Sequence, residues 1–226
     1  MLREKATEVR QELALIARGG RRFFDAVLPF ALFLLLLKPA GTAAAAGVSF
    51  SCGLALSVYR IFRGASPLFS LAGLLVLGIG AVPAVRSGKA GDFLLPNVGT
   101  NFMLFLLCLV SLPLRRPLVA WTSYFARRYP LAWYWHPSVR PAYTEVTILW
   151  ALFFGVRLVL QILLLRSGEE FLLALFSFLS GWPAIVVLLV VSYVYGTWRL
   201  RLLGGPGAEE FRRGDPPPWK GQIRGF

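Results

Sequence analysis

Apolar residues fall into six long runs that are separated by shorter polar or basic segments. The runs cover residues 23–37, 41–62, 68–85, 93–112, 146–165 and 171–198. A run of about 20 apolar residues has the length of a membrane-spanning helix. The first run is short, but Phe23 and Lys38 at its ends can extend it toward the membrane surface. The pattern predicts an all-α polytopic membrane protein with six transmembrane helices in residues 23–198.

The N-terminal segment, residues 1–22, has a different pattern. Apolar side chains recur at alternating steps of four and three, and charged side chains lie between them. The apolar positions are Leu2, Ala6, Val9, Leu13 and Ile16. This spacing predicts an amphipathic helix that lies on the membrane surface and ends at Gly19-Gly20. The same spacing is typical of a coiled-coil seam, so packing against a partner helix is the alternative.

Composition supports a membrane location. Of the 226 residues, 57% are hydrophobic and only 15% are charged, and the mean hydropathy is +0.64. A soluble domain of this length is far less apolar. The formal net charge is +13, but the basic residues lie between the apolar runs rather than along one face. We therefore expect anionic membrane lipid as the partner of the basic loops, and no nucleic acid.

The positions of Lys and Arg predict the orientation. Most of them lie in the N-terminal segment, in the loops after the second and fourth runs, and in the tail after residue 198. These parts share one side of the membrane if there are six spans. Because loops rich in Lys and Arg stay in the cytoplasm, both termini are predicted to be cytoplasmic.

The two longest polar segments have distinct compositions. Residues 115–144 mix arginine with tryptophan and tyrosine, which favours the headgroup layer, so we expect an interfacial loop on the cytoplasmic leaflet. Residues 199–226 are basic and contain the sequences Gly-Gly-Pro-Gly and Pro-Pro-Pro. This composition predicts a disordered cytoplasmic tail.

One charged residue, Arg157, lies inside the fifth apolar run, with Gln161 one helical turn later. Inserting an arginine near the middle of a span costs at least ~2.5 kcal/mol unless other groups solvate it. Two interpretations follow from this cost. Arg157 either fixes the order and register of the helices as a structural residue, or it belongs to a polar pathway or an anion site.

Depth in the membrane identifies candidate neighbours for Arg157. In the fourth run, Asn97 and Asn101 lie ~6 and ~12 Å from the outer face, and Gln161 and Arg157 lie at the same two depths. We predict that Asn97 faces Gln161 and that Asn101 faces Arg157. Pro183 interrupts the sixth run and frees the carbonyl of Leu179 at ~12 Å, where it can accept from the guanidinium. The expected polar centre is therefore uncharged apart from Arg157.

The chain shows no pattern typical of catalysis, of a metal site or of a cofactor site. Cys52 and Cys108 lie within apolar runs and are expected to be small core residues. His136 stands alone in a loop, with no cysteine or carboxylate at ligand spacing. We expect no enzyme activity, cofactor or metal.

Several short motifs resemble the intracellular septation protein A family, also called YciB or IspZ. They are Asp25-Ala-Val-Leu-Pro29, Gly91-Asp-Phe-Leu-Leu-Pro96, Arg116-Pro-Leu-Val119 and Trp150-Ala151. The motif Arg157-Leu-Val-Leu-Gln161 resembles one in an uncharacterised bacterial relative of that family. The resemblance covers residues 23–198. The N-terminal helix, the aromatic loop and the proline-rich tail depart from the septation family, which puts a role specific to division in doubt.

The resemblance implies a bacterial inner-membrane protein that serves envelope maintenance or cell division through protein partners and has no established enzyme activity. Those partners would be other membrane proteins or further copies of the chain. The alternative function is a small transporter, or a conduit for an anion or a lipid, with Arg157 and the asparagines lining the pathway.

Overall fold

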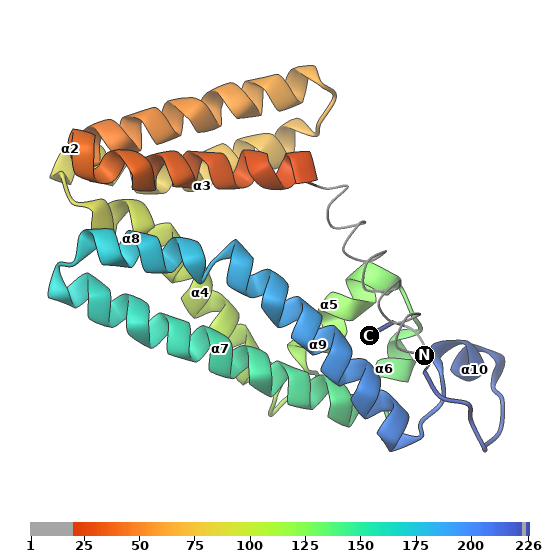
Figure 1. Cartoon of the computed structure of the whole chain (residues 1–226). Coiled ribbons are helices and arrows are strands. Elements are labelled where there is room, and N and C mark those ends of the chain that lie inside the picture. Colours follow the sequence, from red (N-terminus) through yellow and green to blue (C-terminus); the bar gives the residue numbers. More distant parts are fainter. Residues whose placement is uncertain (1–19, 223–224) are drawn as a thin grey trace, which may run out of the picture. The chain divides into compact units, whose positions relative to one another are not determined.

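The computed structural model describes residues 20–222 and 225–226, with side chains from Val27 onward. The predicted N-terminal amphipathic helix lies outside the described residues except for its last three, which begin the first described helix. All regular secondary structure in the described part is helical (Figure 1). The all-α class agrees with the sequence pattern.

Five helical segments are long and apolar enough to cross a membrane. They are Val27–Phe62, Pro67–Ser87, Ala90–Ser111, Arg140–Ser167 and Glu170–Leu203. The number of segments is one fewer than the six predicted spans, because α2 (Gly20–Phe62) contains the first two apolar runs. A straight helix of its length would greatly exceed a ~30 Å hydrocarbon core.

The helix α2 is broken at Gly41, where φ is 78° and ψ is 168°. Pro39, just before it, has no N–H for the helical ladder, and glycine adopts this conformation at little steric cost. The two arms of α2 run in opposite directions on either side of this break (Figure 1). Each arm is therefore a separate apolar helix.

The chain forms two compact units. The first contains residues 1–96 and 168–178. Its described helices are α2, α3 (Pro67–Ser87), the first turns of α4 (Ala90–Ser111) and α8 (Glu170–Leu179). The ring of Phe33 stacks on Phe93 with centroids 3.9 Å apart. Gly80 packs against the backbone of Phe93 so closely that a Cβ atom would meet its carbonyl oxygen. Small residues thus allow close helix contact in this unit.

The second unit contains residues 97–167 and 179–226. It holds the rest of α4, then α5 (Leu118–Arg127), α6 (Leu131–Tyr134), α7 (Arg140–Ser167), α9 (Trp182–Leu203) and α10 (Ala208–Arg213). Helix α7 packs against both α5 and α9. Trp133, Tyr134 and Tyr143 are fully buried in the core formed by α5, α6 and the first turns of α7. These three aromatic residues of the predicted interfacial loop thus belong to a folded core.

The prediction of a disordered tail is wrong for the described residues of that segment. Residues after α9 form α10 and turns that pack on the aromatic core of the second unit. Trp133 Nε1 donates to the carbonyl of Pro206 at 2.8 Å, and the ring of Phe226 stacks on Tyr143 with centroids 4.4 Å apart. Composition alone indicated disorder because glycine and proline lower the tendency to form helices. The tertiary partners that order the segment lie elsewhere in the sequence.

One carboxylate, Glu210, holds the turns of the tail together. It accepts backbone hydrogen bonds from Gly207 at 2.8 Å, Lys220 at 2.8 Å and Gly221 at 3.2 Å. The bonds from Gly207 and Lys220 are the main reason that the pKa of Glu210 is lowered. A lowered folded-state pKa means that this carboxylate stabilises the tail above its ordinary pKa of about 4.3. The contribution disappears as the pH falls through the lowered value.

We predict that Glu210→Gln loosens the tail at neutral pH in the way that acid loosens the wild-type tail. Hydrogen exchange at residues 207–221, measured by mass spectrometry and corrected for the intrinsic pH effect, should be faster in the variant. Glu209→Gln is the matched control, because Glu209 is highly exposed and forms only a surface pair with Arg212 at 3.6 Å. Equal exchange rates in the two variants would show that Glu210 does not organise the tail.

Candidate polar centre

The guanidinium of Arg157 is buried within the second unit, and Arg157 is only 6% exposed. Its Nε donates to Ser180 Oγ at 3.0 Å, and its Nη2 donates to Asn97 Oδ1 at 3.0 Å. These acceptors come from the turn between α8 and α9 and from α4. One side chain of α7 is therefore bonded to two other parts of the unit.

Asn97 also contacts Gln161, as the depth comparison predicted. Gln161 Nε2 donates to Asn97 Oδ1 at 2.9 Å, so one amide oxygen accepts from two donors of α7. Arg157 and Gln161 are four residues apart, and residues at that spacing lie on the same face of a helix. Asn97 is therefore the shared acceptor of this face of α7.

The structure does not pair Asn101 with Arg157, so that part of the prediction is wrong. Asn101 Nδ2 donates to the backbone carbonyl of Phe154 at 3.1 Å. The depth comparison placed Cα atoms and omitted the length of the arginine side chain, which can reach about one turn, ~5.4 Å, along the helix. The guanidinium therefore reaches Asn97 in place of Asn101. The Oδ1 atom of Asn101 is buried and has no hydrogen-bond partner among the described residues.

The helix interruption near Pro183 supplies an acceptor, but from a different atom than predicted. Helix α8 ends at Leu179 and α9 begins at Trp182, with Gly181 as its N-cap residue. The group that binds Arg157 is the hydroxyl of Ser180, within this break, and not the freed carbonyl of Leu179. Pro183 itself is exposed in the first turn of α9. Proline has no N–H that could bond to the carbonyl of Leu179, which agrees with an interruption at this point.

Both of these acceptors are uncharged. They are the hydroxyl of Ser180 and the amide oxygen of Asn97. Hydrogen bonds between membrane helices average only ~0.6 kcal/mol, so several are needed to offset the cost of burying the charge. The arrangement can hold three segments of the second unit in fixed register.

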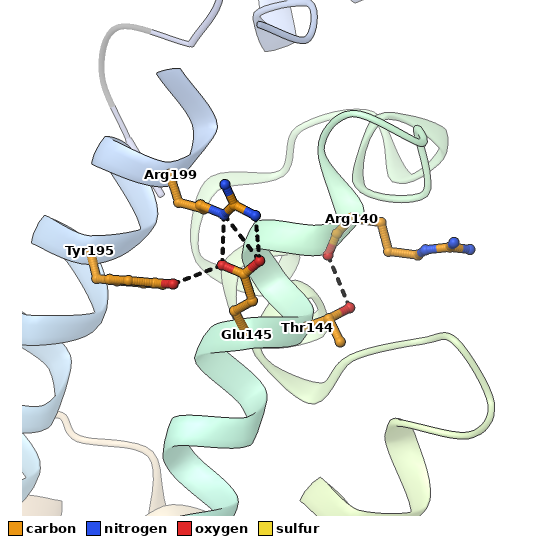
Figure 2. A network of polar contacts seen from close by, with 5 residues as sticks. All are labelled: Arg140, Thr144, Glu145, Tyr195 and Arg199. Carbon is orange, nitrogen blue, oxygen red and sulfur yellow. Dashed lines mark hydrogen bonds and ion pairs between the residues drawn. The ribbon is translucent and has the colours of Figure 1, made fainter. Parts of the chain in front are cut away.

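A second polar group, which the sequence reasoning missed, lies near the start of α7. The carboxylate of Glu145 accepts two hydrogen bonds from Arg199 Nε, at 2.8 and 3.0 Å, and one from Arg199 Nη2, at 2.8 Å (Figure 2). The hydroxyl of Tyr195 donates to the same carboxylate at 2.8 Å. A signal was present, because Glu145 and Arg199 lie at the same end of consecutive antiparallel runs.

Between these two groups, Trp150 Nε1 donates to Ser192 Oγ at 2.8 Å. Helix α7 is thus bonded to α9, or to the turn before it, at three levels. The levels are Glu145 with Tyr195 and Arg199, Trp150 with Ser192, and Arg157 with Ser180. Later residues of α7 pair with earlier residues of α9 and of the turn before it. This order is expected for antiparallel neighbours. This polar seam accompanies the apolar packing of the two helices.

The remaining candidate residues take structural positions. Cys52 and Cys108 are free thiols, and Cys108 is buried beside Ala151 and Phe154. His136 Nδ1 accepts a backbone hydrogen bond from Ser138 at 3.2 Å. Among the described residues, no group of three or more His, Cys, Asp or Glu side chains has the arrangement of a metal site.

The fold and the apolar helices define a helical membrane protein with a buried, hydrogen-bonded arginine. Residues 18–199 match the family described as "Protein of unknown function (DUF3159)", and the chain belongs to that family. The matched part includes Asn97, Arg157, Gln161 and Arg199. No curated protein and no solved structure matches the chain.

We predict that Asn97→Ala destabilises the protein more than Asn101→Ala does. Loss of Asn97 removes the shared acceptor of two buried donors, which costs about 1–3 kcal/mol. Loss of Asn101 removes one bond to a backbone carbonyl, worth ~0.6 kcal/mol. Thermal unfolding of both purified variants in the same detergent measures the difference. Equal melting temperatures would show that Asn97 is not the central acceptor.

The pair of Glu145 and Arg199 should show coupling of modest size. Both side chains are 31% exposed, so we expect a coupling energy of about 1 kcal/mol or less in a double-mutant cycle of Glu145→Gln and Arg199→Gln. Because exposed charges are screened, the coupling should shrink in high salt. Strictly additive effects of the two substitutions would show that the pair contributes nothing to stability.

Proposed function

We propose that this is a multi-pass protein of the bacterial inner membrane that acts in envelope maintenance or cell division by binding protein partners, without catalysis of its own. The observation that supports this best is the buried guanidinium of Arg157, which is bonded to Asn97 and Ser180. A charge held by direct bonds from neighbouring segments suits a rigid scaffold. A scaffold of this kind presents its surfaces to partners, which are other membrane proteins or further copies of the chain.

The proposed topology has six spans with both termini in the cytoplasm. The break at Gly41 supports two crossings within α2, since each arm is apolar and the arms run in opposite directions. The distribution of Lys and Arg supports the orientation. In this topology the basic segments between spans contact anionic lipid of the cytoplasmic leaflet.

One observation favours a second function, which is a conduit for an anion or a lipid. The Oδ1 atom of Asn101 is buried and unbonded among the described residues, and Asn97 and Ser180, which accept from Arg157, are neutral. A positive centre that keeps its charge favours anions. In this alternative, water reaches Asn101 from one side of the membrane.

Two variants of Arg157 separate the candidates. In a strain that lacks the chromosomal gene, we expect Arg157→Lys to restore envelope function. We expect Arg157→Leu to lower the amount of protein in the membrane, with function lost in proportion. A leucine variant that is present at the wild-type level but has no function would favour the conduit, because a pathway needs the charge and a scaffold needs only the fold.

Solvent access at Asn101 is the complementary measurement. We expect Asn101→Cys, made in a chain whose Cys52 and Cys108 are replaced by alanine, to resist a membrane-impermeant thiol reagent in intact cells and in inside-out vesicles. Labelling from either side would overturn the scaffold proposal and support a water-filled vestibule.

A further inference from the structure

Two arginines have a backbone conformation that normally favours glycine. Arg115 has a φ of 54°, and Arg128 has a φ of 56°. Among the described residues, every other position with a positive φ is a glycine. The left-handed conformation is unfavourable for residues with a Cβ atom, and when it persists in such a residue it points to a functional use of the side chain.

Both arginines end a helix. After α4, the N–H of Arg115 bonds to the carbonyl of Leu112 at 3.0 Å, and the N–H of Arg116 bonds to the carbonyl of Ser111 at 3.1 Å. This is the pattern of a Schellman motif, in which glycine is the usual residue at the position of Arg115. Arg128 ends α5 in the simpler left-handed cap, with its N–H bonded to the carbonyl of Tyr124 at 2.8 Å. Glycine would satisfy both caps, so the fold does not require the arginine side chains.

The side chains of Arg115, Arg116 and Arg128 are exposed, and none of them forms an ion pair within the part of the chain that the structure describes. The sequence offers few local partners, because residues 93–144 contain no aspartate or glutamate. The charges of these three arginines are therefore not paired within the described residues.

A run of aromatic side chains begins at Arg116. The guanidinium of Arg116 lies 4.3 Å from the ring of Trp135. Trp135 is 5.7 Å from Trp121, which stacks on Phe125 with centroids 6.4 Å apart. Phe125 is 72% exposed, and Leu114 is 64% exposed. We call Arg116, Trp135, Trp121 and Phe125 the aromatic–arginine strip.

The strip connects two candidate membrane spans. Its residues lie between the end of α4 and the start of α7, so they stand at the end of the bundle where the chain leaves and re-enters the apolar layer. Tryptophan and arginine are typical of that layer, because the apolar part of each side chain enters the acyl boundary and the polar end stays among the headgroups. An exposed phenylalanine beside uncompensated arginines fits an anionic bilayer surface.

We infer that Arg115, Arg128 and the aromatic–arginine strip form a surface that binds the phosphate headgroups of anionic phospholipids in the bilayer that holds the protein. The surface deepens the lipid contact in the proposed function and rests on its membrane location, but it does not rest on protein partners. Phosphate accepts hydrogen bonds from the arginines, while Phe125 and Leu114 contact the acyl region.

The test uses the full chain in phosphatidylcholine vesicles that contain a minority of phosphatidylglycerol. Spin-labelled phosphatidylglycerol and spin-labelled phosphatidylcholine report the preference of the protein for each lipid. For the double variant Arg115→Gly and Arg128→Gly, we expect the preference for phosphatidylglycerol to fall at least about fivefold, which is the effect of roughly one arginine near an anionic surface. The melting temperature should stay equal or rise, because glycine relieves both caps.

Three comparisons control the test. The double variants Arg115→Lys with Arg128→Lys and Arg115→Gln with Arg128→Gln have the same backbone cost, but only the lysine pair keeps the charge. Lysine should retain most of the preference and glutamine should lose it, even if the glycine pair folds poorly. Arg166→Gln removes one charge at the opposite end of α7 and should lower the preference less than the glutamine pair does.

An unchanged preference in the glycine and glutamine pairs would overturn the inference. So would an equal loss in the lysine and glutamine pairs, since charge would then not be the cause. A photoreactive residue at Phe125 that crosslinks in cells to another protein in place of phospholipid would assign the surface to a protein partner and also overturn it. None of these outcomes bears on whether envelope function needs protein partners, so the two proposals can fail separately.

Discussion

A guanidinium inside an apolar helix bundle must have its N–H groups bonded, because an unsatisfied charged donor in that environment costs several kcal/mol. Arg157 meets this constraint with acceptors from α4 and from the break before α9. Each acceptor must lie at one height and face one direction. The requirement therefore defines the relative register of three segments that apolar packing alone would leave free to slide.

Helix α7 carries most of the polar groups that organise the second unit. Glu145 and Trp150 bond to α9, and Arg157 and Gln161 bond to Asn97. On another side of the same helix, Thr147 Oγ1 accepts from the backbone N–H of Val119 at 3.3 Å, near the start of α5. Helix α5 therefore contacts the same helix that holds the polar centre. Helix α7 therefore contacts both α5 and the polar centre around Arg157.

The sequence was sufficient for the long apolar helices and for part of the centre. Apolar run length located the long helices, and depth along antiparallel spans paired Asn97 with Gln161. It paired Asn101 with the wrong group, because side-chain reach is not contained in a comparison of Cα depths. The tail was also missed. Its order depends on Trp133, Tyr143 and Gln222, and the distances between such residues in space do not follow from glycine and proline content.

The two arginines of the α7–α9 seam are hydrogen-bonded to different kinds of acceptor, and the difference follows from solvation. Arg199 is paired with a carboxylate where both side chains are 31% exposed and retain part of their hydration. Arg157 is 6% exposed, and there a carboxylate would add a second desolvation cost that the attraction between the charges need not repay. Neutral amide and hydroxyl acceptors satisfy the guanidinium without that second charge. The same helix can therefore hold an ion pair where water has partial access and a guanidinium bonded to Asn97 and Ser180 within its apolar part, because the acceptor in each case suits the local access of water.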